Sequence, residues 1–180
     1  KVKNIKSAYS NIFLIPIRYS ILFFLMFSLP LIYKIFTPLT VYPVLWLLKL
    51  FYNISFSGNF IIINLKTVIE IIPACIAGSA YLLLLILNLT VPMNTLKRIY
   101  SILLSFLLFL ILNISRIFLL SVLYHNNFYY FDITHKLFWY FLSTLFVIGI
   151  WFLIVKIFSI KEIPVYSDFV KLYNDSKKKK

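Results

Sequence analysis

The amino-acid sequence predicts an all-α membrane protein with about four transmembrane helices, an interfacial helix and a small extracytoplasmic β-hairpin. Hydrophobic residues make up 62% of its 180 residues and charged residues 13%, whereas soluble domains average about 45–50% and about 25%. Four stretches approach the ~20 apolar residues that cross a bilayer. Lys and Arg outnumber Asp and Glu by 18 to 5, and most lie at the chain ends and in one short loop. We therefore expect residues 1–180 to form one integral membrane domain.

The predicted spans cover about residues 12–33, 73–91, 99–124 and 137–155. The second contains no charged residue, and the third contains only Arg116. The first follows a basic segment, as the core of a signal peptide does, but no A-x-A-like cleavage site follows it. We therefore expect an uncleaved first span.

The distribution of basic residues predicts how these spans are oriented. The N-terminal segment, the 92–98 loop and a basic tail at 156–180 together hold 13 of the 18 Lys and Arg residues. Positive charge accumulates on the cytoplasmic side of membrane proteins. We therefore expect a multi-pass protein of the cell membrane with both termini and the 92–98 loop in the cytoplasm.

This orientation leaves residues 38–72 outside the membrane. The stretch 38–51 contains two prolines and a lysine, so we expect it to form a short interfacial helix rather than a span. The stretch 53–65 is rich in β-branched and aromatic residues around Ser57-Gly58-Asn59, which is typical of a hairpin.

The composition excludes several classes of function. A single cysteine rules out an intramolecular disulfide and a CxxC site. Two histidines and five acidic residues offer little for a metal centre, and we expect neither metal nor cofactor. The basic residues form no face with interleaved aromatics, so we expect no nucleic-acid partner.

Arg116 is the first candidate functional residue. An arginine inside a span costs a few kcal/mol and usually has a function. We expect it to face the bundle interior, with Asn113 on the preceding turn. The alternative is an arginine that snorkels outward or only ties helices together.

Cys75 is the second candidate. It follows Pro73-Ala74 at the start of the second span, where the helix dipole and a nearby arginine would favour the thiolate. Small residues at 74, 78 and 79 allow another helix to approach closely. The alternative is a cysteine that packs as a small hydrophobe.

Two histidines, His125 and His135, bracket the predicted outer loop 124–135. His135 follows Asp132 and Thr134, either of which we expect to cap the last helix. There its imidazole could act as a general acid or base. His125 is expected to be a solvated loop residue. The alternative for each histidine is an interfacial aromatic without a function.

The predicted topology places Cys75, Arg116 and His135 in the outer halves of three different helices. A nucleophile, a cation and a base at one face are the components of a cysteine acyl-transfer site.

The sequence resembles the exosortase/archaeosortase family of integral membrane cysteine transpeptidases, and in its length a short archaeal-type member. Residues 73–79 (Pro-Ala-Cys-Ile-Ala-Gly-Ser) resemble the family's cysteine motif, and residues 113–117 (Asn-Ile-Ser-Arg-Ile) resemble its N-x-x-R-[IV] motif. His135, ahead of an aromatic-rich last helix, resembles the final motif. The ordered set covers about residues 38–158. The glycine that usually follows the family's histidine is absent, so His125 stays an alternative to His135.

The resemblance implies a protease or transpeptidase that acts at the extracytoplasmic face. Its partners would be exported proteins that end in a short motif, a transmembrane helix and a basic tail, and a lipid or glycan could accept the product. Cys75 would be the nucleophile that forms a thioester, Arg116 would stabilise the thiolate or oxyanion, and His135 would be the general acid/base. The resemblance requires no cofactor.

Two other functions use the same residues. In a non-enzymatic transport, assembly or lipid-binding subunit, Arg116 would bind an anion and Cys75 would pack. In an acyl transferase with a lipid donor, His135 and Arg116 would act without the thiol, and activity would survive Cys75→Ser.

Overall fold

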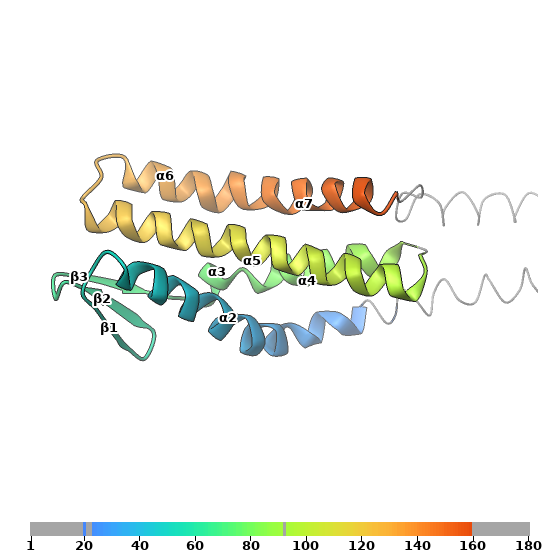
Figure 1. The fold of residues 1–180 in the computed structure, drawn as a ribbon, viewed down its shortest axis with the longest axis horizontal. Helices are drawn as coiled ribbons and strands as arrows, with labels where there is room; N and C mark the ends of the chain where they lie inside the picture. Colours follow the sequence, from blue (N-terminus) through green and yellow to red (C-terminus); the bar gives the residue numbers. More distant parts are fainter. Residues whose placement is uncertain (1–19, 21–22, 92, 160–180) are drawn as a thin grey trace, which may run out of the picture.

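A computed structural model describes residues 20, 23–91 and 93–159 of the chain. The first part of the predicted span 12–33 and most of the predicted basic tail lie outside these residues. The described chain is mostly helical, and its long helices run side by side along the molecule, with a small β-sheet at one end (Figure 1).

Four helical stretches in the described residues are long and apolar enough to cross a membrane. They comprise 27, 18, 31 and 27 residues and are Phe23–Lys49, Pro73–Thr90, Thr95–His125 and Phe131–Ile157. At 1.5 Å per residue even the shortest is about 27 Å long, close to the thickness of a hydrocarbon core. The helical elements within them are η1 (Met26–Ser28), α2 (Leu29–Lys49), α3 (Pro73–Ile76), α4 (Gly78–Thr90), α5 (Thr95–His125), α6 (Phe131–Leu137), the π-helical η2 (Phe138–Leu142) and α7 (Ser143–Ile157).

The polarity of α5 is that of a helix in lipid. Its buried residues recur every fourth position and include three serines and an asparagine: Ser101, Ser105, Phe109, Asn113, Ile117 and Ser121. Large apolar side chains such as Leu103, Leu107 and Ile111 are instead exposed on the outer face. Polar and small residues inside and leucines outside reverse the pattern of a soluble protein, and they are typical of helix contacts in membranes.

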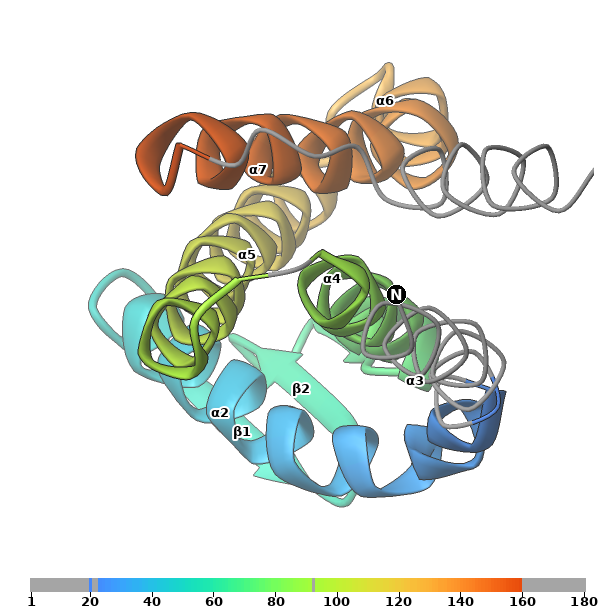
Figure 2. The same ribbon diagram turned by 90° about the vertical axis from the view of Figure 1, so that its right-hand side faces the viewer.

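The expected interfacial helix at 38–51 is wrong as a separate element. The helix α2 continues through Pro38 and Pro43 to Lys49, and it belongs to a membrane-length stretch that covers Phe23–Lys49 of the described residues. Each proline removes one backbone donor, but Val44 and Leu48 are almost completely buried on this half of α2. Their packing outweighs the local tendency to break, and α2 arcs around the other helices (Figure 2).

The predicted hairpin is present and belongs to a sheet of three antiparallel strands in the order β1-β2-β3. The strands are β1 (Ile54–Ser57), β2 (Phe60–Ile63) and β3 (Thr67–Glu70). Gly58 occupies the first turn with a φ of +61°, which glycine adopts without strain. The third strand escaped prediction because the turn before it uses Asn64 and Leu65, both at positive φ, and leucine gives no turn signal.

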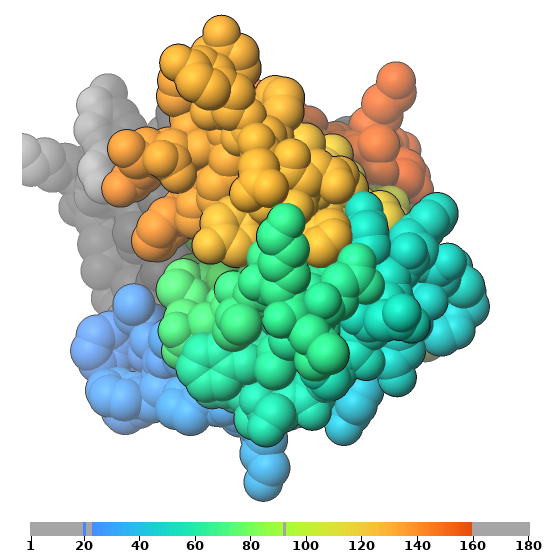
Figure 3. Space-filling model, turned by 90° about the vertical axis from the view of Figure 1, so that its left-hand side faces the viewer, coloured from blue at the N-terminus to red at the C-terminus, as the bar shows by residue number. Residues whose placement is uncertain are grey.

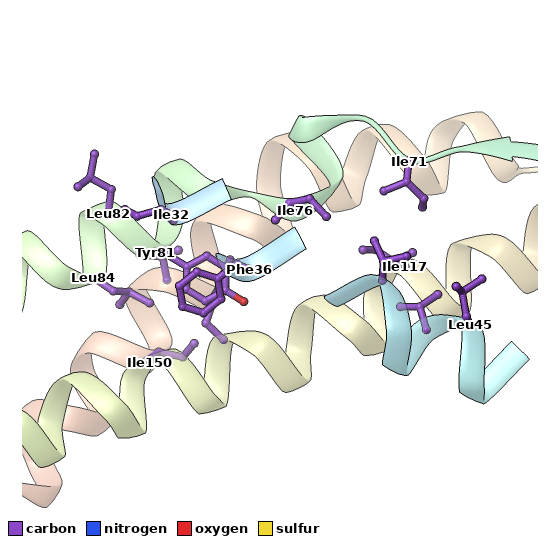
Figure 4. Packing of buried hydrophobic residues seen from close by; sticks show 14 of the residues in the cluster. Ile32, Phe36, Leu45, Ile71, Ile76, Tyr81, Leu82, Leu84, Ile117 and Ile150 are labelled. Atoms are coloured by element: carbon purple, nitrogen blue, oxygen red, sulfur yellow. The ribbon is translucent and has the colours of Figure 1, made fainter. Parts of the chain in front are cut away.

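The centre of the bundle is an aromatic cluster around Tyr81, which is fully buried. Its ring stacks on Phe36 with centroids 3.7 Å apart, and the edges of Phe106 and Phe109 complete the contact. Figure 4 shows Tyr81 and Phe36 among buried aliphatic residues from α2, α4, α5 and α7. The cluster therefore joins α2, α4 and α5.

Candidate functional site

The second membrane-length stretch is interrupted next to the cysteine. The one-turn helix α3 ends at Ala77, which has the left-handed values φ 56° and ψ 45°, and α4 begins at Gly78. The carbonyls of Cys75 and Ile76 therefore lose the donors that a continuous helix would supply. In lipid, such carbonyls must find partners inside the protein.

Side chains of α5 supply those partners. The Asn113 side chain donates from Nδ2 to the carbonyls of Cys75 (3.1 Å) and Ile76 (3.2 Å). Arg116 donates from Nη2 to the same Cys75 carbonyl at 2.9 Å. The two polar residues of the 113–117 motif thus hold the interrupted helix in place, and as predicted they share one face of α5.

This interruption corrects the expected helix over 73–91. A four-residue helix has almost no macrodipole, so the predicted dipole effect on the Cys75 thiolate is wrong. Gly78 is required for a different reason: a Cβ atom there would lie 2.7 Å from a ring carbon of Tyr33 in α2. The small residues at 74, 78 and 79 predict only a close helix contact, and no local pattern indicates the interruption.

Arg116 lies inside the bundle, as its cost in lipid predicts. Its Nη1 donates to Ser143 Oγ at 2.7 Å, and Ser143 donates in turn to the carbonyl of Phe138 at 2.7 Å. That carbonyl lies in the π-helical turn η2, between α6 and α7. Arg116 therefore connects the interruption beside Cys75 with the irregular turn of the last membrane-length stretch.

Cys75, Arg116 and His135 line one cavity of about 310 Å³. Its walls are β3 with the two residues after it, the start of α3, the C-terminal half of α5, and α6 with η2. Most of the lining is apolar and includes Ile117, Leu120, Phe138 and Trp139. Three residues that the sequence predicted to converge from separate helices thus share one cavity.

His135 lies in the middle of α6 rather than in a loop. Its ring stacks on Phe131, with centroids 5.6 Å apart and planes at 17°, and lies 6.0 Å from Trp139. The expected capping by Asp132 or Thr134 is wrong, because α6 begins at Phe131 and no side chain caps it. The sequence predicts a loop at 128–131, but Phe131 is already the first residue of α6.

His125 has a different environment. It ends α5, with its Nδ1 2.8 Å from Thr67 Oγ1 and its Nε2 3.3 Å from Asn64 Nδ2. The ring of Tyr52 packs against it edge-on at 4.9 Å. His125 is therefore not the solvated loop residue that we expected, since it attaches the sheet to α5. It does not line the cavity that contains Cys75.

Sequence reasoning missed Glu70, which also lines the cavity. It is exposed at the end of β3, and it is the only acidic residue before Asp132 in the sequence. That isolation, five residues before Cys75, was the available signal. Among residues 23–91 and 93–159, no three of His, Cys, Asp and Glu lie close enough together to hold a metal ion.

Comparison with protein-family models, with curated proteins and with solved structures found no match to this chain. The resemblance of its motifs to the exosortase/archaeosortase family therefore stays a prediction from the sequence. The geometry that bears on function is the convergence of Cys75, Arg116 and His135 on one cavity.

Proposed function

We propose that the protein is a membrane-embedded cysteine protease or transpeptidase that cleaves the C-terminal sorting signals of exported proteins at the extracytoplasmic face. One observation carries this proposal: Cys75, the only cysteine of the chain, lines the same cavity as Arg116 and His135. A nucleophile, a cation and a proton carrier around one cavity are what acyl transfer requires.

The chemistry divides into two balanced steps. In the first, the Cys75 thiolate attacks the carbonyl carbon of the scissile peptide, a C–S bond forms, and the carbonyl oxygen becomes an oxyanion. The intermediate then collapses, the C–N bond breaks, and the leaving amine takes a proton from protonated His135. In the second, water or the nucleophilic group of a lipid or glycan acceptor loses a proton to His135, attacks the thioester and releases the thiolate.

Arg116 supplies positive charge beside the nucleophile. A guanidinium has five N–H donors, and the bonds to Ser143 and to the Cys75 carbonyl use one on each terminal nitrogen. The remaining donors are available for a thiolate or oxyanion. A fixed cation in a largely apolar cavity stabilises developing negative charge more strongly than one in water.

The test is thiol dependence in living cells. Candidate substrates are proteins of the same genome that share a C-terminal motif, an apolar helix and a basic tail. We expect Cys75→Ala and Cys75→Ser each to stop their processing while the protein still accumulates in the membrane. Ser79→Ala is the matched control, because Ser79 is a small, exposed residue just after the interruption and does not line the cavity.

A hydroxylamine-sensitive adduct between wild-type protein and substrate would identify the thioester. Continued processing by Cys75→Ala, in cells without a related enzyme, would disprove the proposal. It would then favour the acyl transferase that uses His135 and Arg116 without the thiol.

The contacts of Arg116 also favour a second candidate, a non-enzymatic membrane subunit. Both hydrogen bonds of its guanidinium go to groups of the protein itself, as they would in an arginine that only ties helices together. That candidate requires that Cys75→Ala leave every function of the protein unchanged.

A further inference from the structure

β3 is an edge strand whose outer side faces the candidate site. In the part of the chain that the structure describes, the sheet order is β1-β2-β3, so β3 pairs there with β2 on one side only. The sheet and the α6 region form neighbouring parts of this end of the molecule (Figure 3). The residues at 68–72 all line the cavity that contains Cys75.

Three consecutive residues of β3, at 68–70, line the cavity together with the two residues that follow the strand. Side chains of a strand alternate between its two faces, so a strand that lines a cavity with one face contributes every second residue. The unbroken run of Val68, Ile69 and Glu70 within β3 instead indicates that the backbone itself forms part of the wall. The wall is therefore a row of peptide groups as well as side chains.

The register of the sheet shows which peptide groups of β3 do not face β2. Phe60 pairs with Glu70, and the amide of Ile71 donates to the carbonyl of Asn59 at 2.9 Å. In an antiparallel pair, hydrogen-bonded and non-hydrogen-bonded positions alternate. The amides and carbonyls of Val68 and Glu70 therefore point away from β2. Beyond them, the carbonyl of Ile72 accepts from the amide of Cys75 at 2.9 Å, so the edge leads directly to the nucleophile.

We infer that the substrate of this site is an extended polypeptide segment that pairs with the free edge of β3 as a fourth strand; this inference rests on the proposed function. At about 3.4 Å per residue, the 68–72 edge is about 14 Å long and accommodates four to five substrate residues. An acyl chain carries no donors or acceptors and would leave the edge amides unpaired in an apolar cavity, which is costly. A peptide strand satisfies them, as strand addition does in other peptide-binding proteins.

The lining also indicates the side chains that such a segment would carry. Side chains of the added strand alternate between the two faces of the sheet, and the walls beside them include Ile117, Phe138 and Trp139. Apolar side chains at alternate substrate positions fit these walls. Glu70, exposed at the end of the strand, is the one acidic group near them.

The test uses peptides of alternating valine and alanine that carry biotin and a central diazirine-bearing leucine, added to membranes that contain the full-length protein. After illumination we expect cross-links within 68–75 or 131–139. Methylation of one set of alternate peptide amides should lower the yield at least fivefold, and methylation of the intervening amides less than twofold. Equal loss for both sets, no loss for either, no cross-link, or cross-links elsewhere would overturn the inference.

Two substitutions sharpen the experiment. Glu70→Pro removes an amide that faces the free edge, where proline is tolerated, and should lower cross-linking at least fivefold, whereas Glu70→Ala should change it less than twofold. If Glu70→Pro does not accumulate in the membrane, the cross-linking yields of the methylated peptides alone test the inference. Cys75→Ala should cross-link like the wild type, because strand pairing does not need the thiol. Loss of the alternating pattern with normal thiol-dependent processing would overturn only this inference, whereas processing without Cys75 would overturn only the proposed function.

Discussion

Two asparagines at opposite ends of the α4–α5 contact show how polar groups serve different purposes in one bundle. Asn88 is fully buried and donates to the carbonyl of Leu84 (2.7 Å) and to Ser105 Oγ (3.2 Å), while it accepts from Ser101 Oγ. Asn113 is 3% exposed and donates to the carbonyls of Cys75 and Ile76. The hydrogen bonds of Asn88 join two regular helices, whereas those of Asn113 support a helix that is interrupted.

The difference follows from the backbone opposite each asparagine. Around Asn88 the helix α4 is regular, so its main-chain bonds are internal and the side chains bond to each other and to the turn below. Around Asn113 the left-handed Ala77 frees two carbonyls, and these accept from Asn113 and Arg116. Only the interrupted end borders the cavity with Cys75. Interhelical polar contacts in membranes therefore do not mark a site by themselves; the interruption of the helix distinguishes this one.

The largest expected effect concerns which end of the bundle faces outward. An impermeant maleimide applied to intact cells should label Cys75 in the wild type. In a Cys75→Ala background it should label Asn59→Cys, in the turn between β1 and β2, and not Asn94→Cys, before α5. The reason is that basic residues hold the 92–98 loop in the cytoplasm. Ready labelling at position 94 with none at position 59 would invert the orientation and remove the extracytoplasmic site.

Loss of Arg116 should abolish processing while the protein still inserts. Arg116→Ala removes a charge whose insertion costs a few kcal/mol, so the amount of protein in the membrane should not fall. Arg116→Lys should restore only part of the activity, because an ammonium cannot donate to both Ser143 and the Cys75 carbonyl with the same planar fork. Immunoblots of substrate and enzyme measure both quantities. Full activity of Arg116→Ala would show that this arginine has only a structural role.

The two asparagines provide the matched pair that tests the comparison directly. Asn113→Ala leaves two carbonyls with fewer donors, which costs about 1–3 kcal/mol of stability, and displacement of Cys75 should lower activity per folded protein at least tenfold. Asn88→Ala should cost a similar amount of stability, about 1–2 kcal/mol, and should change activity less than twofold.

Unfolding in detergent and processing in membranes measure the two effects separately. Equal loss of activity in Asn113→Ala and Asn88→Ala would show that general stability, and not the interruption, controls the site.

The smallest effects should separate the two histidines. His135→Ala should lower turnover, because His135 lines the cavity. It should change stability little, because His135 is exposed. His125→Ala should lower stability by about 1 kcal/mol through lost contacts to Thr67 and Asn64, with a much milder effect on processing. Turnover that falls more in His125→Ala than in His135→Ala would reverse the assignment.

Much of this arrangement was predictable because it depends on local composition. Four apolar stretches and the inward position of Arg116 follow from the cost of placing charge and unpaired backbone in lipid. The hairpin follows from the strand-forming residues on either side of the turn at Gly58. The predictions failed where packing competes with local preference. Pro38 and Pro43 read as the limits of a separate helix, yet α2 passes through both. Asp132 reads as a cap, yet α6 has already begun at Phe131.

Residue type and spacing thus predicted a mostly helical chain, the four membrane-length helices of the described residues, and the convergence of Cys75, Arg116 and His135. The tertiary structure alone decided that the helix is interrupted at Ala77, that Asn113 and Arg116 bind the freed carbonyl of Cys75, and that the edge of β3 forms one wall of the cavity. These features depend on groups up to 41 residues apart. Their partners are chosen by which helices pack together, and no local pattern specifies that.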